Sequence, residues 1–142
     1  MSAGDPSLTE ILAKATFRST GIGTNLVISW RYADDLLTMR IEGSSSDALP
    51  DRLAQSTAGL FAHLRPRRAA IDLTAVQSLP SVVLAYIVYF QKTAEETQVP
   101  KVVLYGVSPR VSTLLKMIGM ADFFAVVPKA DDVAGWYSSQ GH

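Results

Sequence analysis

Residues 69–81 have the sequence AAIDLTAVQSLPS and are followed directly by the apolar run VVLAYIVYF, residues 82–90. This pattern predicts a buried strand that ends in a short polar turn, with Ser81 where the next helix begins. Backbone N–H groups in the first turn of a helix have no partner within the helix, and the helix dipole is positive there. A serine at this place either caps the helix or carries a phosphate, and both interpretations of Ser81 stay open at this point.

The composition of the chain is that of a globular protein. Its 142 residues, of which 48% are hydrophobic and 18% charged, are enough for one domain with a buried core. The 13 basic and 13 acidic residues give a net charge of zero, which provides no general attraction to nucleic acid or to anionic lipid. The absence of cysteine excludes disulfides, thiolate metal sites and cysteine nucleophiles. No apolar run is long enough to span a bilayer and no signal peptide is recognised, so we expect a cytoplasmic protein without membrane insertion.

The segment before residue 69 predicts an N-terminal extension, a hairpin and a helix. The extension covers residues 1–24, with a short helix that begins at Asp5-Pro6 and a turn at residues 21–23. Two β-prone runs, 26–32 and 36–42, are joined by a polar connection in which Asp34 and Asp35 are interpreted as turn residues rather than catalytic carboxylates. A helix follows, with its apolar residues spaced on one face: Leu53, Thr57, Leu60, Phe61 and Leu64.

After residue 98 the chain alternates between strands and helices. Residues 101–106 predict a buried strand, Ser108-Pro109 a helix start, and 123–127 a further strand. Asp131-Asp132 is predicted to begin the last helix. Two apolar strands separated by a helix imply a right-handed parallel βαβ unit. The predicted class is therefore α/β: a mixed β-sheet made of an initial hairpin and then parallel βαβ units, with helices packed on it.

Three stretches of the sequence resemble the STAS domain, the module of bacterial anti-sigma factor antagonists and of sulphate transporter tails. They are residues 39–43 (MRIEG), residues 71–81, and residues 103–120, which contain VLYGVSPRV and LLKMIGM. The resemblance covers residues 25–137 and implies a STAS-like domain over residues 25–142. In such antagonists the turn is Asp-Ser-Ser-Gly or Asp-Ser-Thr-Gly, and its first hydroxyl residue is phosphorylated by a cognate kinase. The matching positions here are Pro80, Ser81, Val82 and Val83, which retain the serine but not the aspartate or the glycine.

The resemblance implies a regulatory protein-binding module, a cytoplasmic bacterial phosphoprotein that acts in transcription regulation by partner switching, with Ser81 as the phosphoacceptor. The implied partner is an anti-sigma factor or a switch serine kinase, together with a PP2C-like phosphatase. The alternative is a phosphorylation-independent scaffold or transport-complex subunit that binds through the helix at residues 82–90. The oligomeric state, a homodimer included, stays open.

The sequence does not predict an enzyme, a metal site or a cofactor. It contains no nucleophile–base pair, no metal-spaced set of ligands and no glycine-rich phosphate loop. His63 lies off the apolar row of its helix and is interpreted as a surface residue. Arg65, Arg67 and Arg68 around Pro66 are interpreted as solvated charge in a helix-to-strand loop.

The run at residues 82–90 covers every side of its helix, whereas a helix that lies on a sheet needs only one apolar stripe. One face carries Val83, Ile87 and Phe90, and another carries Val82, Tyr86 and Tyr89. If one face packs on the sheet, part of the other is free as a contact patch, unless the N-terminal segment or the last helix covers it. The candidate partner-binding residues are Pro80, Ser81, Val82, Val83, Tyr86 and Tyr89.

Overall fold

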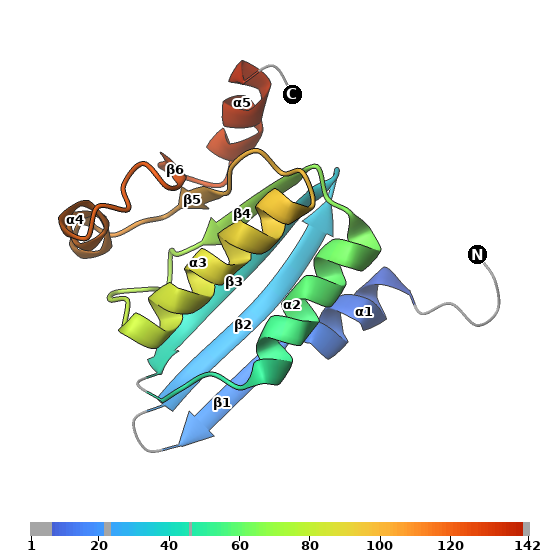
Figure 1. Cartoon of the computed structure of the whole chain (residues 1–142), viewed down its shortest axis with the longest axis horizontal. Coiled ribbons are helices and arrows are strands. Elements are labelled where there is room, and N and C mark those ends of the chain that lie inside the picture. Colours follow the sequence, from blue (N-terminus) through green and yellow to red (C-terminus); the bar gives the residue numbers. More distant parts are fainter. Residues whose placement is uncertain (1–6, 22–23, 46, 141–142) are drawn as a thin grey trace.

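The computed structural model describes residues 7–21, 24–45 and 47–140, which form one six-stranded sheet in the order β1-β2-β3-β4-β5-β6 (Figure 1). The strands are β1 (Phe17–Gly21), β2 (Thr24–Ala33), β3 (Leu36–Ser45), β4 (Arg68–Asp72), β5 (Val103–Tyr105) and β6 (Ala125–Val127). The helices are α1 (Leu8–Ala15), α2 (Asp51–Leu64), α3 (Ser81–Glu96), α4 (Pro109–Met117) and α5 (Asp132–Ser139). Strands β1 to β3 pair antiparallel, and β3 to β6 pair parallel. The predicted mixed α/β sheet is confirmed.

The predicted hairpin is formed by β2 and β3, with Asp34 and Asp35 in its turn. Both residues have positive φ angles, 53° and 63°, which is the conformation of a tight turn that matches the twist of the two strands. Aspartate tolerates this conformation better than most residues. The interpretation of the aspartate pair as turn residues is therefore confirmed.

Strand β1 was not predicted, because residues 17–21 were assigned to the N-terminal extension. They pair antiparallel with β2 and form an edge of the sheet. Helix α1 is confirmed, although its N-cap is Ser7, whose Oγ accepts a hydrogen bond from the N–H of Glu10 at 3.2 Å. The predicted start at Asp5-Pro6 lies outside the described residues, as does most of the predicted turn at 21–23. Because β1 is short and mostly polar, it gives little strand signal.

The two faces of the sheet carry different cores. Helices α2 and α3 lie across the face in front of β2 to β4 in Figure 1 and bury the larger core against it. Alternate residues of a strand point to opposite faces, so Ile71 and Leu104 face this core while Ala70 and Val103 face the other side. There α5 covers β4 to β6 with its buried residue Val133. The connection from β4 to α3 leaves the sheet at the carboxyl end of β4 and leads to Ser81, the first residue of α3.

Candidate partner-binding site

The segment that leads to Ser81 is the loop of residues 73–80, which joins the end of β4 to the start of α3. Three of its apolar side chains, Leu73, Val76 and Leu79, are buried at 0%, 2% and 8% exposure. These three side chains anchor the loop to the core. Pro80 is half-buried, whereas Ser81 is exposed, so the loop delivers the serine to the surface.

Helix α3 begins at Ser81, and its N-cap is Pro80 in an extended conformation with no side-chain capping hydrogen bond. The interpretation of Ser81 as an N-cap is therefore wrong, because proline holds that place and has no side-chain acceptor. The first intrahelical bond runs from the N–H of Leu84 to the carbonyl of Pro80 at 2.9 Å. The N–H groups of the first turn, from Ser81 to Val83, precede that bond and are not capped by a side chain. The phosphoacceptor role of Ser81 stays a prediction.

One face of α3 packs on the sheet as expected. Val83, Ile87 and Phe90 are buried at 2%, 1% and 0% exposure. The ring of Phe90 stacks on Trp30 of β2 with centroids 6.1 Å apart, and it packs edge-to-face with the ring of Phe61 of α2, with centroids 5.1 Å apart. This corrects the candidate surface at one position, because Val83 is a core residue and does not reach a partner in this fold.

The second face of α3 is covered by α2, and not by the N-terminal segment or the last helix as the sequence alternative expected. The hydroxyl of Tyr86 is hydrogen-bonded to that of Thr57, and the hydroxyl of Tyr89 donates to the carbonyl of Ala54 at 3.0 Å. Burial raises the pKa of the Tyr86 hydroxyl, and the side chain is only 5% exposed. Tyr86 is thus also removed from the candidate surface, whereas Val82 and Tyr89 are half-buried and keep some access.

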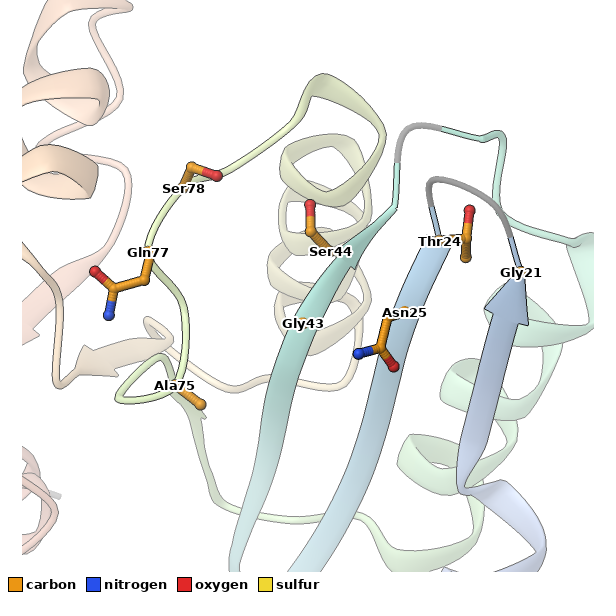
Figure 2. Close-up of a pocket in the computed structure, with 8 residues that line it drawn as sticks. All are labelled: Gly21, Thr24, Asn25, Gly43, Ser44, Ala75, Gln77 and Ser78. Atoms are coloured by element: carbon orange, nitrogen blue, oxygen red, sulfur yellow. The ribbon is translucent and has the colours of Figure 1, made fainter.

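A hollow of about 500 Å³ lies beside the loop at the carboxyl end of β3 (Figure 2). It is lined by Gly21, Thr24, Asn25, Gly43, Ser44, Ala75, Gln77 and Ser78. In Figure 2, β3 with Ser44 lies between the loop that carries Ser78 and the residues Asn25 and Gly21 of β2 and β1. Ligand sites of open α/β sheets are commonly at the carboxyl ends of the strands. The described residues that line the hollow offer hydroxyl and amide groups and carry no charge.

Behind the loop, on the sheet face opposite α2 and α3, three side chains form a polar network that sequence reasoning missed. The guanidinium of Arg40 pairs with Asp72 at 2.8 Å and donates to the hydroxyl of Thr74 at 3.1 Å. Burial alone would raise the pKa of the Asp72 carboxyl, but the hydrogen bonds from Thr74 and Arg40 outweigh it and lower the pKa. The order Asp-x-Thr is a local sequence signal for a turn. No residue near Asp72 in the sequence indicates that Arg40 binds to it.

Arg65 and Arg67 are exposed between α2 and β4, as predicted, whereas Arg68 is half-buried and is the first residue of β4. Arg65 ends α2 in a left-handed conformation, and the N–H groups of Arg67 and Arg68 both donate to the carbonyl of Asp35. The three arginines line a cavity of about 540 Å³ together with Asp35 and with Gln98 beyond the end of α3. The guanidinium of Arg68 donates a hydrogen bond to the carbonyl of Asp34 in the turn between β2 and β3.

His63 is exposed on α2, as expected of a surface residue. Among the residues that the structure describes, no three histidine, aspartate or glutamate side chains are close enough together to hold a metal ion. In the same residues, no helix has an apolar stretch that would reach across a bilayer.

The fold and the exposed serine after a parallel strand define an α/β module with its candidate site at a strand-to-helix turn. The family model described as the STAS domain matches residues 27–133, and the chain belongs to this family. No curated protein sequence matches the chain.

Solved structures share the fold at low sequence identity. A substituted form of RsbS from Moorella thermoacetica is 18% identical with a TM-score of 0.69, over 80% of this chain and 98% of that one. An anti-sigma factor antagonist from Mycobacterium paratuberculosis is 20% identical with a TM-score of 0.63, over 78% and 92% of the two chains. A chain of the stressosome, described as a signal integration and transduction hub, is 18% identical with a TM-score of 0.57, over 80% and 98%.

Proposed function

We propose that the chain is a regulatory protein-binding module of the anti-sigma factor antagonist type, which acts in the bacterial cytoplasm by partner switching. Membership of the STAS family and the likeness to an anti-sigma factor antagonist and to a stressosome chain support this proposal. The observation that carries it is the exposed hydroxyl of Ser81 above an uncapped helix start. The chain itself performs no catalysis, because the phosphate chemistry belongs to the partner.

The proposed switch is electrostatic. A phosphate on Ser81 adds about −1.5 to −2 charge at the start of α3, where the dipole and the free N–H groups stabilise it. Pro80, Ser81, Val82 and the described residues that line the hollow of Figure 2 are uncharged, and Asp51 lies in the pocket that Val82 lines. A partner that fits this neutral surface loses affinity when a doubly charged group must be buried against it. Phosphorylation therefore releases the partner.

The residues that replace the family pattern are compatible with this switch. Val83 stands where the family has glycine, and its side chain points into the core, so its bulk does not obstruct an approaching partner. Val82 is half-buried beside Ser81 and adds apolar contact area. The proposed partner is an anti-sigma factor or a switch serine kinase, with a PP2C-like phosphatase that removes the phosphate.

A second candidate function is a phosphorylation-independent scaffold or transport-complex subunit. The observation that favours it is Pro80, which takes the place of the family aspartate and brings no carboxylate to the turn. In this case the same surface binds its partner permanently, and Ser81 contributes contact area rather than a switch.

Phosphopeptide mapping of the chain isolated from its own host, in growth and in stress, tests the proposal. The variants are Ser81→Ala and, as a control, Ser138→Ala, because Ser138 is an exposed serine of α5, outside the proposed surface. We expect a condition-dependent phosphate that Ser81→Ala lacks and Ser138→Ala retains, and a co-purifying partner that leaves when the phosphate appears. An unmodified Ser81 under every condition, with the partner still bound, would refute the switch and favour the scaffold.

A further inference from the structure

We propose that Arg40 is a positioning residue for the Ser81 turn, because its guanidinium clamps the beginning of the loop that carries Ser81. The biological meaning of this inference rests on the proposed function. The clamp itself is a property of the chain alone and is testable without any partner.

The clamp holds residue 74, near the beginning of the loop, by hydrogen bonds to both its backbone and its side chain. One nitrogen of Arg40, Nη1, lies 2.8 Å from Oδ2 of Asp72 and 3.1 Å from Oγ1 of Thr74. The other carboxylate oxygen of Asp72, Oδ1, accepts hydrogen bonds from the N–H of Thr74 at 2.9 Å and from its hydroxyl at 2.6 Å. Charge-assisted bonds of this kind are stronger than neutral ones and fix geometry as well as distance.

The pairing of β3 with β4 places the guanidinium of Arg40 next to the beginning of the loop. Arg40 and Asp72 are direct partners in the register of β3 and β4, so their side chains stand side by side on one face. Glu42, two residues further along β3 and on the same face, accepts a hydrogen bond from Nε of Arg40 at 2.9 Å. This bond turns the Nη1 side of the guanidinium towards Asp72. Arg40 takes part in both of the ion pairs found in the described part of the chain.

Thr74 is held from the other side by the backbone that follows β5. Gly106 has a φ angle of 69°, and a Cβ atom on it would lie 2.1 Å from Cγ2 of Thr74 and 2.9 Å from its backbone. Thr74 therefore lies between the clamp and a close backbone contact. Three later residues of the loop, Ala75, Gln77 and Ser78, line the hollow on the side of the loop (Figure 2). The position of Thr74 thus sets the position of that side of the hollow.

The clamp has little effect on overall stability. The side chains of Arg40 and Glu42 are 41% and 47% exposed, so water screens their ion pair, and exposed pairs contribute little to folding. The larger anchors of the loop are the buried Leu73, Val76 and Leu79. Loss of Arg40 is therefore expected to loosen the beginning of the loop without unfolding the domain.

Amide hydrogen exchange of the full chain, followed by NMR, tests the clamp. The variant is Arg40→Met, and the control is Arg31→Met. Arg31 is an exposed arginine on the same sheet face as Arg40, and both residues line a cavity of about 150 Å³ on that face. The N–H groups of Thr74 and Val76 donate hydrogen bonds to Oδ1 of Asp72 and to the carbonyl of Leu73. We expect exchange of these two amides to become about tenfold faster in Arg40→Met, as loss of a charge-assisted hydrogen bond predicts, with an unchanged urea midpoint. Arg31→Met is expected to behave like the wild type, and Arg40→Lys to restore part of the protection.

The inference is overturned if loop exchange in Arg40→Met equals that of the Arg31→Met control, or if all amides accelerate together. If Arg40→Met does not fold, Thr74→Val replaces it, since it removes the hydroxyl that both Arg40 and Asp72 bind. The same loop-selective increase is expected in Thr74→Val, and its absence refutes the clamp.

Phosphopeptide mapping in the host then tests whether Arg40 affects the phosphorylation of Ser81. Lower occupancy of Ser81 in Arg40→Met than in Arg31→Met supports the positioning role, and equal occupancy contradicts it. If the wild type carries no phosphate, the proposed switch fails, and the exchange experiment alone decides whether the clamp exists.

Discussion

Helices α3 and α4 both begin after a parallel strand with a serine next to a proline, but in opposite order. In α4, Ser108 is the N-cap and Pro109 the first helical residue, and the hydroxyl of Ser108 accepts a hydrogen bond from the N–H of Val111 at 3.2 Å. In α3, Pro80 is the N-cap and Ser81 the first helical residue, without a side-chain cap. The hydroxyl of Ser108 is therefore used in a capping hydrogen bond, whereas that of Ser81 makes no capping bond and is available for modification. The order of two residues thus separates a structural serine from a candidate modification site.

The largest effect is expected at Gly106, where the segment before α4 contacts Thr74 in the loop before α3. In Gly106→Ala the new Cβ clashes with Thr74 and the residue keeps a positive φ, so we expect a loss of about 2–4 kcal/mol in the free energy of unfolding. The control is Gly119→Ala, which also has a positive φ but has open space around it, and whose expected loss is about 1 kcal/mol. Urea denaturation measures both. Equal losses would show that the contact with Thr74 is loose.

The next effect compares the two serines directly. Ser108→Ala removes the N-cap of α4 and is expected to lower the free energy of unfolding by about 1 kcal/mol. Ser81→Ala removes no capping bond and is expected to stay within about 0.5 kcal/mol of the wild type. Urea midpoints of the two variants decide this, and a similar loss in both would contradict the difference between the helix starts.

A smaller effect is expected when α3 receives the cap that α4 already has. Pro80→Asp places a carboxylate acceptor at the N-cap, but it also frees the unfolded chain, so we expect a net gain of about 0.5 kcal/mol. Thermal unfolding measures the gain, with Pro109→Ala as a control that brings no acceptor and is expected to be slightly less stable. A destabilised Pro80→Asp variant would show that the start of α3 does not accept a cap.

The smallest effect concerns pH, through the carboxylate that holds the loop before α3. Burial tends to raise the pKa of Asp72, but hydrogen bonds from Thr74 and Arg40 lower it below its ordinary value. Its contribution to stability is therefore present above the unfolded pKa, ~4, and is lost as the pH falls through the lower folded pKa. The difference in urea midpoint between the wild type and Asp72→Asn is expected to shrink below pH ~4. A difference that does not change with pH would exclude this linkage.

Local patterns were enough to predict most of the fold. The hairpin around Asp34 and Asp35, the parallel strands and the capped start of α4 at Ser108 depend on turn chemistry and periodicity over a few neighbouring residues. The same logic placed Ser81 at a helix start but could not decide which residue occupies the N-cap. That choice depends on the extended conformation of Pro80, which the buried Leu79 helps to fix.

By itself, the sequence determined the mixed sheet, the order of its elements and the presence of a serine where α3 begins. Only the tertiary structure decided that α2 covers Tyr86, that residues 17–21 form an edge strand, and that Arg40 clamps the loop. Arg40 and Asp72 are 32 positions apart, and Tyr86 is 29 positions from Thr57. Contacts between such distant residues depend on how strands align and helices pack, and no window of neighbouring residues contains that information.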